Sequence, residues 1–486
     1  MSTTTAPGSS TLIESRGIEI IPESERTARP RDLFWPWFAA NVSVFGMSYG
    51  SFLLGFGISL WQATVVAIVG IVVSFALCGL IAIAGKRGSA PTMVLSRAAF
   101  GVQGQKIPGI VSWLTSIGWE TSLTITAVLA TTTVLHALGW VGAGGDVAVH
   151  LIATIVVAAL IVAASVLGYH TIMRLQSVLT WLTGAFTVLF LVLTFQSIHW
   201  DTAFSRPDGT LAQTIGALVM VMTGFGLGWI NIAADWSRYQ KRSTPDGAIV
   251  AWNTIGGSVA PIILVFFGLL LAGSDDKLAA AVGADPIGAL AGLLPAWALF
   301  PFLIVAILTL VSGAVLGIYS SGLTLLSLGI RIPRPAAAAV DGVILTIGTI
   351  VVVFFAQDFI GPFQSFLLTL GVPMAGWAGI LIADILRRRK DYDEAALFDP
   401  RGRYGAWDAT SIVTLVVVSV IGWGLVVNSF AEAAPWNNWQ GYLLPLIGGK
   451  DGEWAYANLG VFFALVLGFL VTWFARAARI RRQEQE

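Results

Sequence analysis

The sequence is poor in charge. Only 11% of its 486 residues are Asp, Glu, Lys or Arg, whereas 56% are hydrophobic. Soluble domains carry about 25% charged residues, so the composition excludes an ordinary water-soluble protein and indicates an integral membrane protein. The 27 basic and 27 acidic residues give a net charge of zero, and the basic runs are better explained as topology signals than as a nucleic-acid surface.

Cysteine and histidine are also scarce. The one cysteine, Cys78, excludes a disulfide within the chain. No cluster of His, Asp and Glu has the spacing of metal ligands, and we therefore expect no metal, no cofactor and no enzymatic active site. The four histidines lie near the ends of apolar stretches, far apart in the sequence: His136, His150, His170 and His199.

Motifs of several other membrane-protein classes are missing. No Gly-rich phosphate-binding motif with Lys and Ser/Thr is present, which argues against a primary pump. Filter-like repeats and rings of charge are absent, which argues against a channel. Residues 1–32 are polar and contain no apolar core stretch, so we expect no cleavable signal peptide and assign insertion to the first span.

Long apolar stretches fill the rest of the chain. A stretch of roughly 20 apolar residues crosses a bilayer as a helix, which predicts an all-α protein with twelve transmembrane helices. The expected spans are 35–58, 61–84, 109–137, 147–168, 173–197, 211–234, 248–273, 296–329, 339–356, 360–386, 409–430 and 455–477. The expected division is a cytoplasmic tail 1–32, a ten-helix core 33–390, a cytoplasmic loop 391–407, helices 11 and 12 within 408–478, and a cytoplasmic tail 479–486.

The loop charges orient these spans. With the N-terminus inside, only Arg206, Lys277 and Lys450 of the 27 basic residues fall in outer loops. This asymmetry follows the positive-inside rule, and a miscount by one span would destroy it. We therefore expect both termini on the cytoplasmic side of the inner (plasma) membrane.

Two expected spans contain helix-breaking segments. Span 1 holds Asn41–Gly50 (NVSVFGMSYG), and span 6 holds Thr223–Trp229 (TGFGLGW) followed by Asn231. Glycines also serve close helix packing, but two interruptions five spans apart are typical of transporters built as inverted five-helix repeats. Unwound backbone lining a midplane cavity can offer N–H and C=O groups to a substrate and an ion.

Only one formal charge, Glu120, is expected deep inside a span, and it follows Trp119. At 1.5 Å per residue from Gly109, both residues lie about 15 Å into span 3, near the bilayer midplane. A carboxylate there costs a few kcal/mol and is rarely without a role. Trp119 could stack on a flat ring and Glu120 could accept its N–H groups; alternatively, the two are a packing residue and a structural carboxyl.

Three further segments are candidates for function. Span 8 carries hydroxyl residues that could bind a hard cation or simply permit close packing. Span 10 carries Gln364 and a Gly371–Pro373 pair that indicates a gating element or a plain kink. Asp235 and Arg238, three residues apart, are either an inner gate or an idle surface pair.

Several of these motifs together resemble the purine–cytosine permease branch of the nucleobase–cation symporter-1 family. The resemblance covers roughly residues 15–390. The matching segments are Gly17–Thr27 (GIEIIPESERT), Phe34–Asn41 (FWPWFAAN), Arg97–Gly104 (RAAFGVQG) with Pro108, Gly118–Trp119, Ala234–Tyr239 (ADWSRY) and Ile318–Leu323 (IYSSGL).

The resemblance implies a LeuT-like fold, with spans 1–5 and 6–10 as inverted repeats and two extra C-terminal helices. It implies a symporter that imports a nucleobase-like heterocycle by alternating access, coupled to Na+ or H+, without an obligate protein partner. The substrate-site residues would be Phe45, Gly46, Ser48, Trp119, Glu120, Phe225, Gly226, Gly228, Trp229, Gly317 and Gln364. The ion site would comprise Val42, Phe45, Thr309 and Ser312.

Departures from the family pattern leave alternatives open. Relatives carry a substrate-binding asparagine in span 8, whereas Ala314 to Gly317 offer no polar side chain here, and Glu120 could replace it. An acid at that place also suits an amine or vitamin-like cationic heterocycle. Ser312 is followed by Gly313 rather than a second hydroxyl, which keeps proton coupling through Glu120 open. A membrane-embedded enzyme or a channel are remote alternatives.

Overall fold

The computed structural model describes residues 17–142, 144–165, 169–330, 332–356, 358–430 and 438–485, without the side chains of 165, 169–176, 334 and 335. The first sixteen residues of the expected N-terminal tail and the last three of the expected fourth span therefore lie outside the described residues. Within these ranges the chain is helical, and its only β-bridge joins Ala28 to Gln240.

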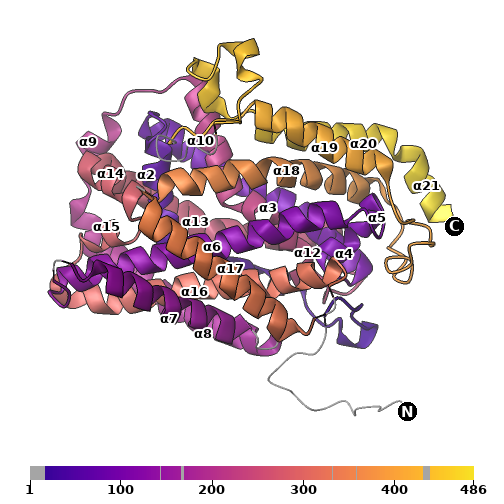
Figure 1. Ribbon diagram of the computed structural model, residues 1–486, viewed down its shortest axis with the longest axis horizontal. Helices are drawn as coiled ribbons and strands as arrows, with labels where there is room; N and C mark the ends of the chain where they lie inside the picture. Colours follow the sequence, from indigo (N-terminus) through magenta and orange to yellow (C-terminus); the bar gives the residue numbers. More distant parts are fainter. Residues whose placement is uncertain are drawn as a thin grey trace.

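Long helices run side by side through the molecule (Figure 1). They are α3 (Leu60–Gly88), α6 (Lys106–Ala137), α7 (Asp146–Ser165), α8 (Tyr169–Thr194), α10 (Leu211–Gly224), α13 (Asp246–Ser274), α16 (Ala296–Ser327), α17 (Arg334–Phe355), α18 (Ile360–Arg387), α19 (Ala409–Gly424) and α20 (Gly460–Ala475).

Short helices gather at the two ends of the bundle (Figure 1). One end holds α9 (Trp200–Phe204), α14 (Asp276–Ala284) and α15 (Gly288–Ala291). The other end, called the α4–α12 end below, holds α4 (Thr92–Leu95), α5 (Arg97–Phe100), α12 (Ala233–Ser237) and α21 (Ala477–Gln485).

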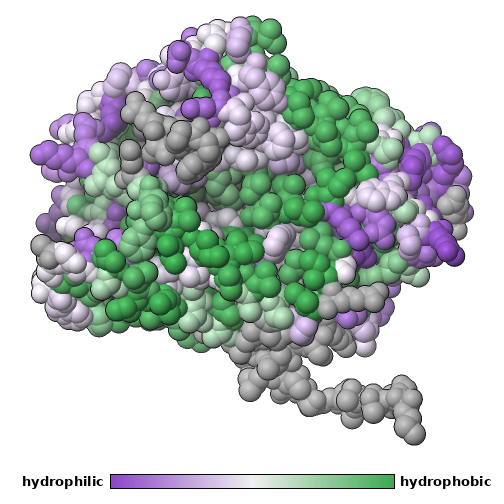
Figure 2. Space-filling model, viewed as in Figure 1, coloured by the Kyte–Doolittle hydropathy of each residue, from purple (hydrophilic) through white to green (hydrophobic). Residues whose placement is uncertain are grey.

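Apolar side chains form a broad band over the middle of the molecule, and hydrophilic residues gather toward its two ends (Figure 2). Among the described residues, eight helices are long and apolar enough to cross a membrane, and a ninth is obtained if α20 and α21, bent by 56°, are counted as one span. The protein is therefore a multi-pass membrane protein. The count of twelve spans stays a prediction.

Glycines bring the helices of the bundle into direct backbone contact. A Cβ placed on Gly50 of α2 (Phe45–Leu54) would lie 2.2 Å from the carbonyl carbon of Gly268 in α13, and one on Gly379 of α18 would lie 2.1 Å from the Leu465 oxygen of α20. Small residues of this kind replace the hydrophobic effect as the basis of helix association in lipid.

The described part of the N-terminal segment packs against the α4–α12 end. The backbone N–H of Ile21 donates to the Ser89 oxygen at 3.0 Å, and that of Ala28 donates to the Tyr239 oxygen at 3.2 Å. Arg26 is 1% exposed and donates to the backbone oxygens of Gln240 and Lys86. Residues 17–33 are thus packed onto the helix ends.

The expectation that Glu120 would be the one charge deep in a span is wrong. Asp341 in α17 and Asp384 in α18 are also fully buried. The sequence estimate began span 9 at residue 339, whereas α17 begins at Arg334, so Asp341 lies about 10 Å along its helix. Asp384 lies three residues from the end of α18 at Arg387 and pairs with Arg388, so it is a buried charge near a helix end rather than at depth.

Asp384 lies in a buried ion network that joins α18 to the C-terminal helices. Its carboxylate binds Arg388 and Arg476, and the Nε of Arg476 lies 3.2 Å from the Asp408 carboxylate. All four side chains are at most 3% exposed. Such a network is costly to desolvate, and it is strongly destabilised when one partner is removed.

We predict that Asp384→Asn destabilises the bundle by about 3–5 kcal/mol, because two guanidinium groups lose their buried countercharge. The thermal unfolding midpoint of the detergent-solubilised protein measures this. Asp276→Asn is the control: Asp276 binds Arg206, but its side chain is 89% exposed, and surface pairs contribute little. Equal midpoints for the two variants would contradict the structural role of the network.

Candidate functional site

Two helix interruptions meet near the middle of the bundle. The first separates α1 (Phe34–Asn41) from α2, with Val42, Ser43 and Val44 outside helical structure. The side chain of Asn41 donates to the Trp37 oxygen at 2.8 Å, and the Ser43 hydroxyl accepts the Phe45 N–H at 3.3 Å. These bonds satisfy part of the backbone that the break frees.

The second interruption follows α10, where Phe225 adopts φ −117° and ψ −109° before α11 (Gly226–Trp229), the 3-10 turn η4 (Ile230–Ile232) and α12. The Tyr49 hydroxyl donates to the Gly224 oxygen at 3.3 Å, and the Ser74 hydroxyl accepts the Gly226 N–H at 3.1 Å. Gly226 must be glycine, because a Cβ would lie 2.2 Å from the carbonyl carbon of Ser74.

Both interruptions line one small hollow of about 40 Å³. Tyr49, Trp119, Leu123 and Gly313 complete its wall from α2, α6 and α16. The residues from the interruptions are Ala40, Asn41, Ser43, Phe45, Gly46, Gly224, Phe225 and Trp229, and Thr309 lines it from α16. Backbone and aromatic rings therefore surround the space.

Trp119 lies at the junction of this hollow with a neighbouring one of about 10 Å³. Its indole is 8% exposed and rests on Gly228, where a Cβ would come within 2.8 Å of the ring. The rings of Phe363 and Phe366 meet it edge-on, at centroid distances of 5.5 and 5.7 Å. Its Nε1 has no hydrogen-bond partner, so this donor is available to a ligand.

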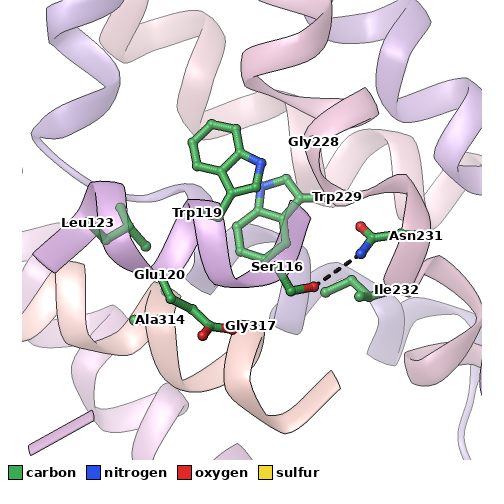
Figure 3. A pocket seen from close by; sticks show the side chains of 11 residues that line it. Ser116, Trp119, Glu120, Leu123, Gly228, Trp229, Asn231, Ile232, Ala314 and Gly317 are labelled. Carbon is green, nitrogen blue, oxygen red and sulfur yellow. Dashed lines mark hydrogen bonds between the residues drawn. The ribbon is translucent and has the colours of Figure 1, made fainter. Parts of the chain in front are cut away.

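Glu120 points away from the Trp119 indole, toward α16 (Figure 3). It is fully buried, and neither carboxyl oxygen has a hydrogen-bond partner. A Cβ on Gly317 would lie 3.0 Å from its Oε1. The acid thus occupies the space that a side chain at position 317 would take, and it lines the smaller hollow with Ser116 and Ala314.

Asn231 joins the second interruption to α6. Its Nδ2 donates to the hydroxyls of Ser112 and Ser116, at 3.0 and 3.1 Å, and Figure 3 shows it beside Trp229. The sequence identifies Asn231 only as part of a broken segment, because a single sequence does not show which helix will pack against it. The contact fixes the register of the broken helix against α6.

The sequence matches a known family over most of its length. Residues 20–443 match permeases for cytosine/purines, uracil, thiamine and allantoin. The chain belongs to this family. It is a transporter of nucleobase-like substrates, not an enzyme. A Bacillus subtilis (strain 168) protein assigned as a purine–cytosine permease, YxlA, is 24% identical over 451 residues, covering 91% of this chain and 93% of its own.

One further relative by sequence and one solved structure are similar to the chain. The purine–cytosine permease fcyB of Emericella nidulans is 25% identical over 262 residues, 52% of this chain and 48% of its own. The structure of Mhp1, a nucleobase-cation-symport-1 transporter in a closed conformation with bromovinylhydantoin bound, superposes with a TM-score of 0.69 at 18% identity, covering 98% of this chain and 100% of Mhp1.

The fold of the permease is LeuT-like. A Na+-coupled sialic acid symporter also superposes, with a TM-score of 0.58 at 12% identity over 93% of this chain and 91% of its own. At these identities the likeness concerns the fold alone. The all-helical membrane architecture expected from the sequence is confirmed.

Some predicted site residues of the permease lie away from these hollows. The Ser48 hydroxyl donates to the Pro286 oxygen at 2.9 Å, near α15. Gln364 is 1% exposed and accepts the Phe430 N–H at 3.3 Å. Val42 and Ser312 are buried but line neither hollow, whereas Thr309 and Phe45 line the larger one.

The two predicted gate residues, Asp235 and Arg238, are buried and hydrogen-bonded. Asp235 is 2% exposed and accepts from the Thr92 N–H and hydroxyl, both at 2.7 Å. Arg238 is fully buried and donates to the Gly17 oxygen at 3.4 Å and to the Tyr319 hydroxyl at 3.1 Å. They connect α12 to α4, to the N-terminal segment and to α16, so they are not an idle surface pair.

We predict that Gly317→Ala impairs transport, because its methyl group would meet the Glu120 carboxyl at 3.0 Å and displace it. Gly322→Ala on the same helix is the matched control, since a Cβ there meets nothing within 4 Å. Initial uptake of radiolabelled cytosine and hypoxanthine, normalised to protein in the membrane, measures the effect. Equal uptake by both variants would show that the position of the Glu120 carboxyl group does not matter for transport.

Proposed function

We propose that this permease is a secondary active transporter that imports a nucleobase-like heterocycle of the cytosine/purine class by alternating access, coupled to H+ or Na+. The observation that carries the proposal is the convergence of both helix interruptions and Trp119 on one buried hollow. Interrupted helices of this kind expose backbone N–H and C=O groups at the membrane midplane, which suits a flat, polar ring.

The proposed architecture has twelve spans, with spans 1–5 and 6–10 as inverted repeats and two additional C-terminal helices. The core would comprise residues 33–390, with both termini on the cytoplasmic side of the inner (plasma) membrane. In this arrangement α1 and α2 form span 1, and α10 to α12 form span 6. No cofactor and no obligate protein partner is needed for the cycle.

In the proposed site the substrate ring stacks on Trp119, with the segment Phe225–Trp229 on its other side. Buried Gly228 presents no side chain to the indole, and Phe363 and Phe366 pack against the ring. Gly46 lines the larger hollow and would admit the ring close to backbone, whereas Gly226 packs on Ser74 and the space beside Gly317 is filled by Glu120. Ser48 and Gln364 would not touch the substrate and would affect its binding only by holding α2 and α18 in place.

The proposed sodium site lies where the first interruption faces α16, with carbonyls at Val42 and Phe45, the Thr309 carbonyl and the Ser312 hydroxyl. Thr309 and Phe45 share the larger hollow, which supports this placement. Coupling to protons instead would use Glu120. A cationic amine or vitamin-like heterocycle is the second candidate substrate, because Glu120 is an acid with two unpartnered oxygens.

We predict that Trp119→Ala weakens substrate affinity by about 5–150-fold, because base–aromatic stacking contributes about 1–3 kcal/mol. Trp119→Phe should retain part of the affinity. KM values for radiolabelled cytosine, adenine and hypoxanthine in proteoliposomes measure this, with Trp181→Ala as control because that side chain is 71% exposed. An unchanged KM in Trp119→Ala would refute stacking on this ring.

We predict that Glu120→Gln abolishes accumulation driven by a pH gradient and leaves the fold intact, since the amide cannot release a proton. Sodium and pH gradients are imposed separately on proteoliposomes, and competition with cationic amines is measured in parallel. If the variant accumulates substrate normally in a pH gradient, Glu120 does not couple protons. Loss of amine competition alone would assign it to substrate recognition.

A further inference from the structure

A second buried carboxyl group, Asp341, lies next to Glu120 where α6, α16 and α17 meet. Asp341 is fully buried, accepts from Trp113 Nε1 at 2.8 Å and also accepts from the Ser321 hydroxyl. Glu120 is fully buried, with no hydrogen-bond partner on either oxygen. Ser321 lies one turn of α16 from Gly317, the residue that packs against Glu120.

No basic side chain of the described residues neutralises the pair. Asp341 has only neutral donors, and the charged groups on the surrounding helices lie at helix ends or have other partners. These are Asp146 with His136, His150 near Asp285, Asp235 with Thr92, Arg238 with Tyr319, Asp384 with Arg388, Arg97 with the Ser327 oxygen, and Lys106 beside Gly329.

Two carboxylates in a dry interior cannot both be ionised without a countercharge, so the pair must hold a proton. The donors are unequally distributed: Asp341 has two, which stabilise its ionised form, and Glu120 has none. The proton therefore resides on Glu120 while Asp341 is the carboxylate. This is the arrangement of acid groups that share one proton in aspartic proteases, with unequal environments deciding the site.

Glu120 and Asp341 lie at different depths along the bundle. Trp113, which holds Asp341, precedes Glu120 by seven residues on α6, which is two turns or about 10 Å toward the α4–α12 end. Ser321 follows Gly317, the residue against Glu120, by one turn of α16 in the same direction. Glu120 thus borders the smaller hollow, and Asp341 lies between it and the α4–α12 end.

We propose that Glu120 and Asp341 share a single proton bridged by Ser321, and that this proton couples transport by passing from the substrate hollow toward the α4–α12 end. In the transfer, Glu120 gives its proton to Ser321 Oγ while Ser321 passes its hydroxyl proton to Asp341 Oδ2. Glu120 becomes the carboxylate and Asp341 the acid. The inference rests on the proposed transport function and assigns its coupling ion.

The test compares Asp341→Asn and Ser321→Ala with the control Thr126→Val, whose hydroxyl is buried and bonds only within α6, to the Ser122 oxygen at 2.8 Å. The full-length protein is reconstituted in proteoliposomes with trapped pyranine. Radiolabelled cytosine counterflow without any ion gradient measures binding and alternation. Cytosine accumulation in an imposed pH gradient and acidification of the lumen measure coupling.

We expect Asp341→Asn to keep counterflow but lose pH-driven accumulation and substrate-dependent acidification by at least about tenfold. Ser321→Ala should slow acidification, and Thr126→Val should behave as wild type. Normal pH-driven accumulation in Asp341→Asn would overturn the proposal, as would wild-type accumulation that follows sodium and ignores pH. Absence of counterflow in the wild type would instead refute the proposed substrate class.

Infrared spectroscopy tests the shared proton without any substrate, even if the wild type shows no cytosine counterflow. Infrared spectra of the purified protein at neutral pH should contain a protonated carboxylic acid band that disappears in Glu120→Gln and persists in Asp341→Asn. A spectrum without this band in the wild type, or a band lost only in Asp341→Asn, would overturn the shared-proton assignment. Normal thermal unfolding of each variant confirms that it is folded.

Discussion

The structure depends on one constraint: a backbone N–H or C=O group inside a membrane must find a partner within the protein. Continuous helices satisfy it automatically, and the two interruptions satisfy it through neighbours. Ser74 accepts from Gly226, Tyr49 donates to the Gly224 oxygen, and Asn231 reaches the serines of α6. The second break is therefore held by α2, α3 and α6, and the Tyr49 bond joins it to the helix that follows the first break.

Glycine has two separate uses in this permease. At Gly50, Gly268 and Gly379 it lets helices touch through their backbones, which stabilises association where lipid offers no hydrophobic driving force. At Gly228 and Gly317 it makes room for functional side chains, since the spaces beside them are filled by Trp119 and Glu120. The sequence alone does not distinguish the two uses, because in both cases it shows only a glycine within an apolar span.

The buried charges also fall into two groups that differ in their partners. Asp384 is bound by Arg388 at the end of its own helix and by Arg476 from the C-terminal part of the chain, so its charge is neutralised and it joins the added C-terminal helices to the core. Among the described side chains, Glu120 and Asp341 have no cationic partner, so a proton must take its place. Both groups are costly to bury. Only the second has a state that can change during a transport cycle.

The sequence by itself determined the class of the protein, since low charge and long apolar stretches are compatible only with a membrane-spanning helical bundle, and its motifs indicated the family. It also located both helix interruptions, because glycine and asparagine weaken helices locally. The tertiary structure decided which side chains meet. Asp341 is far from Glu120 in sequence, so only the packing of α6, α16 and α17 brings the two acids to one region of the bundle. The orientation of Glu120 away from Trp119 follows from the same packing, because neighbouring residues on a helix face different partners.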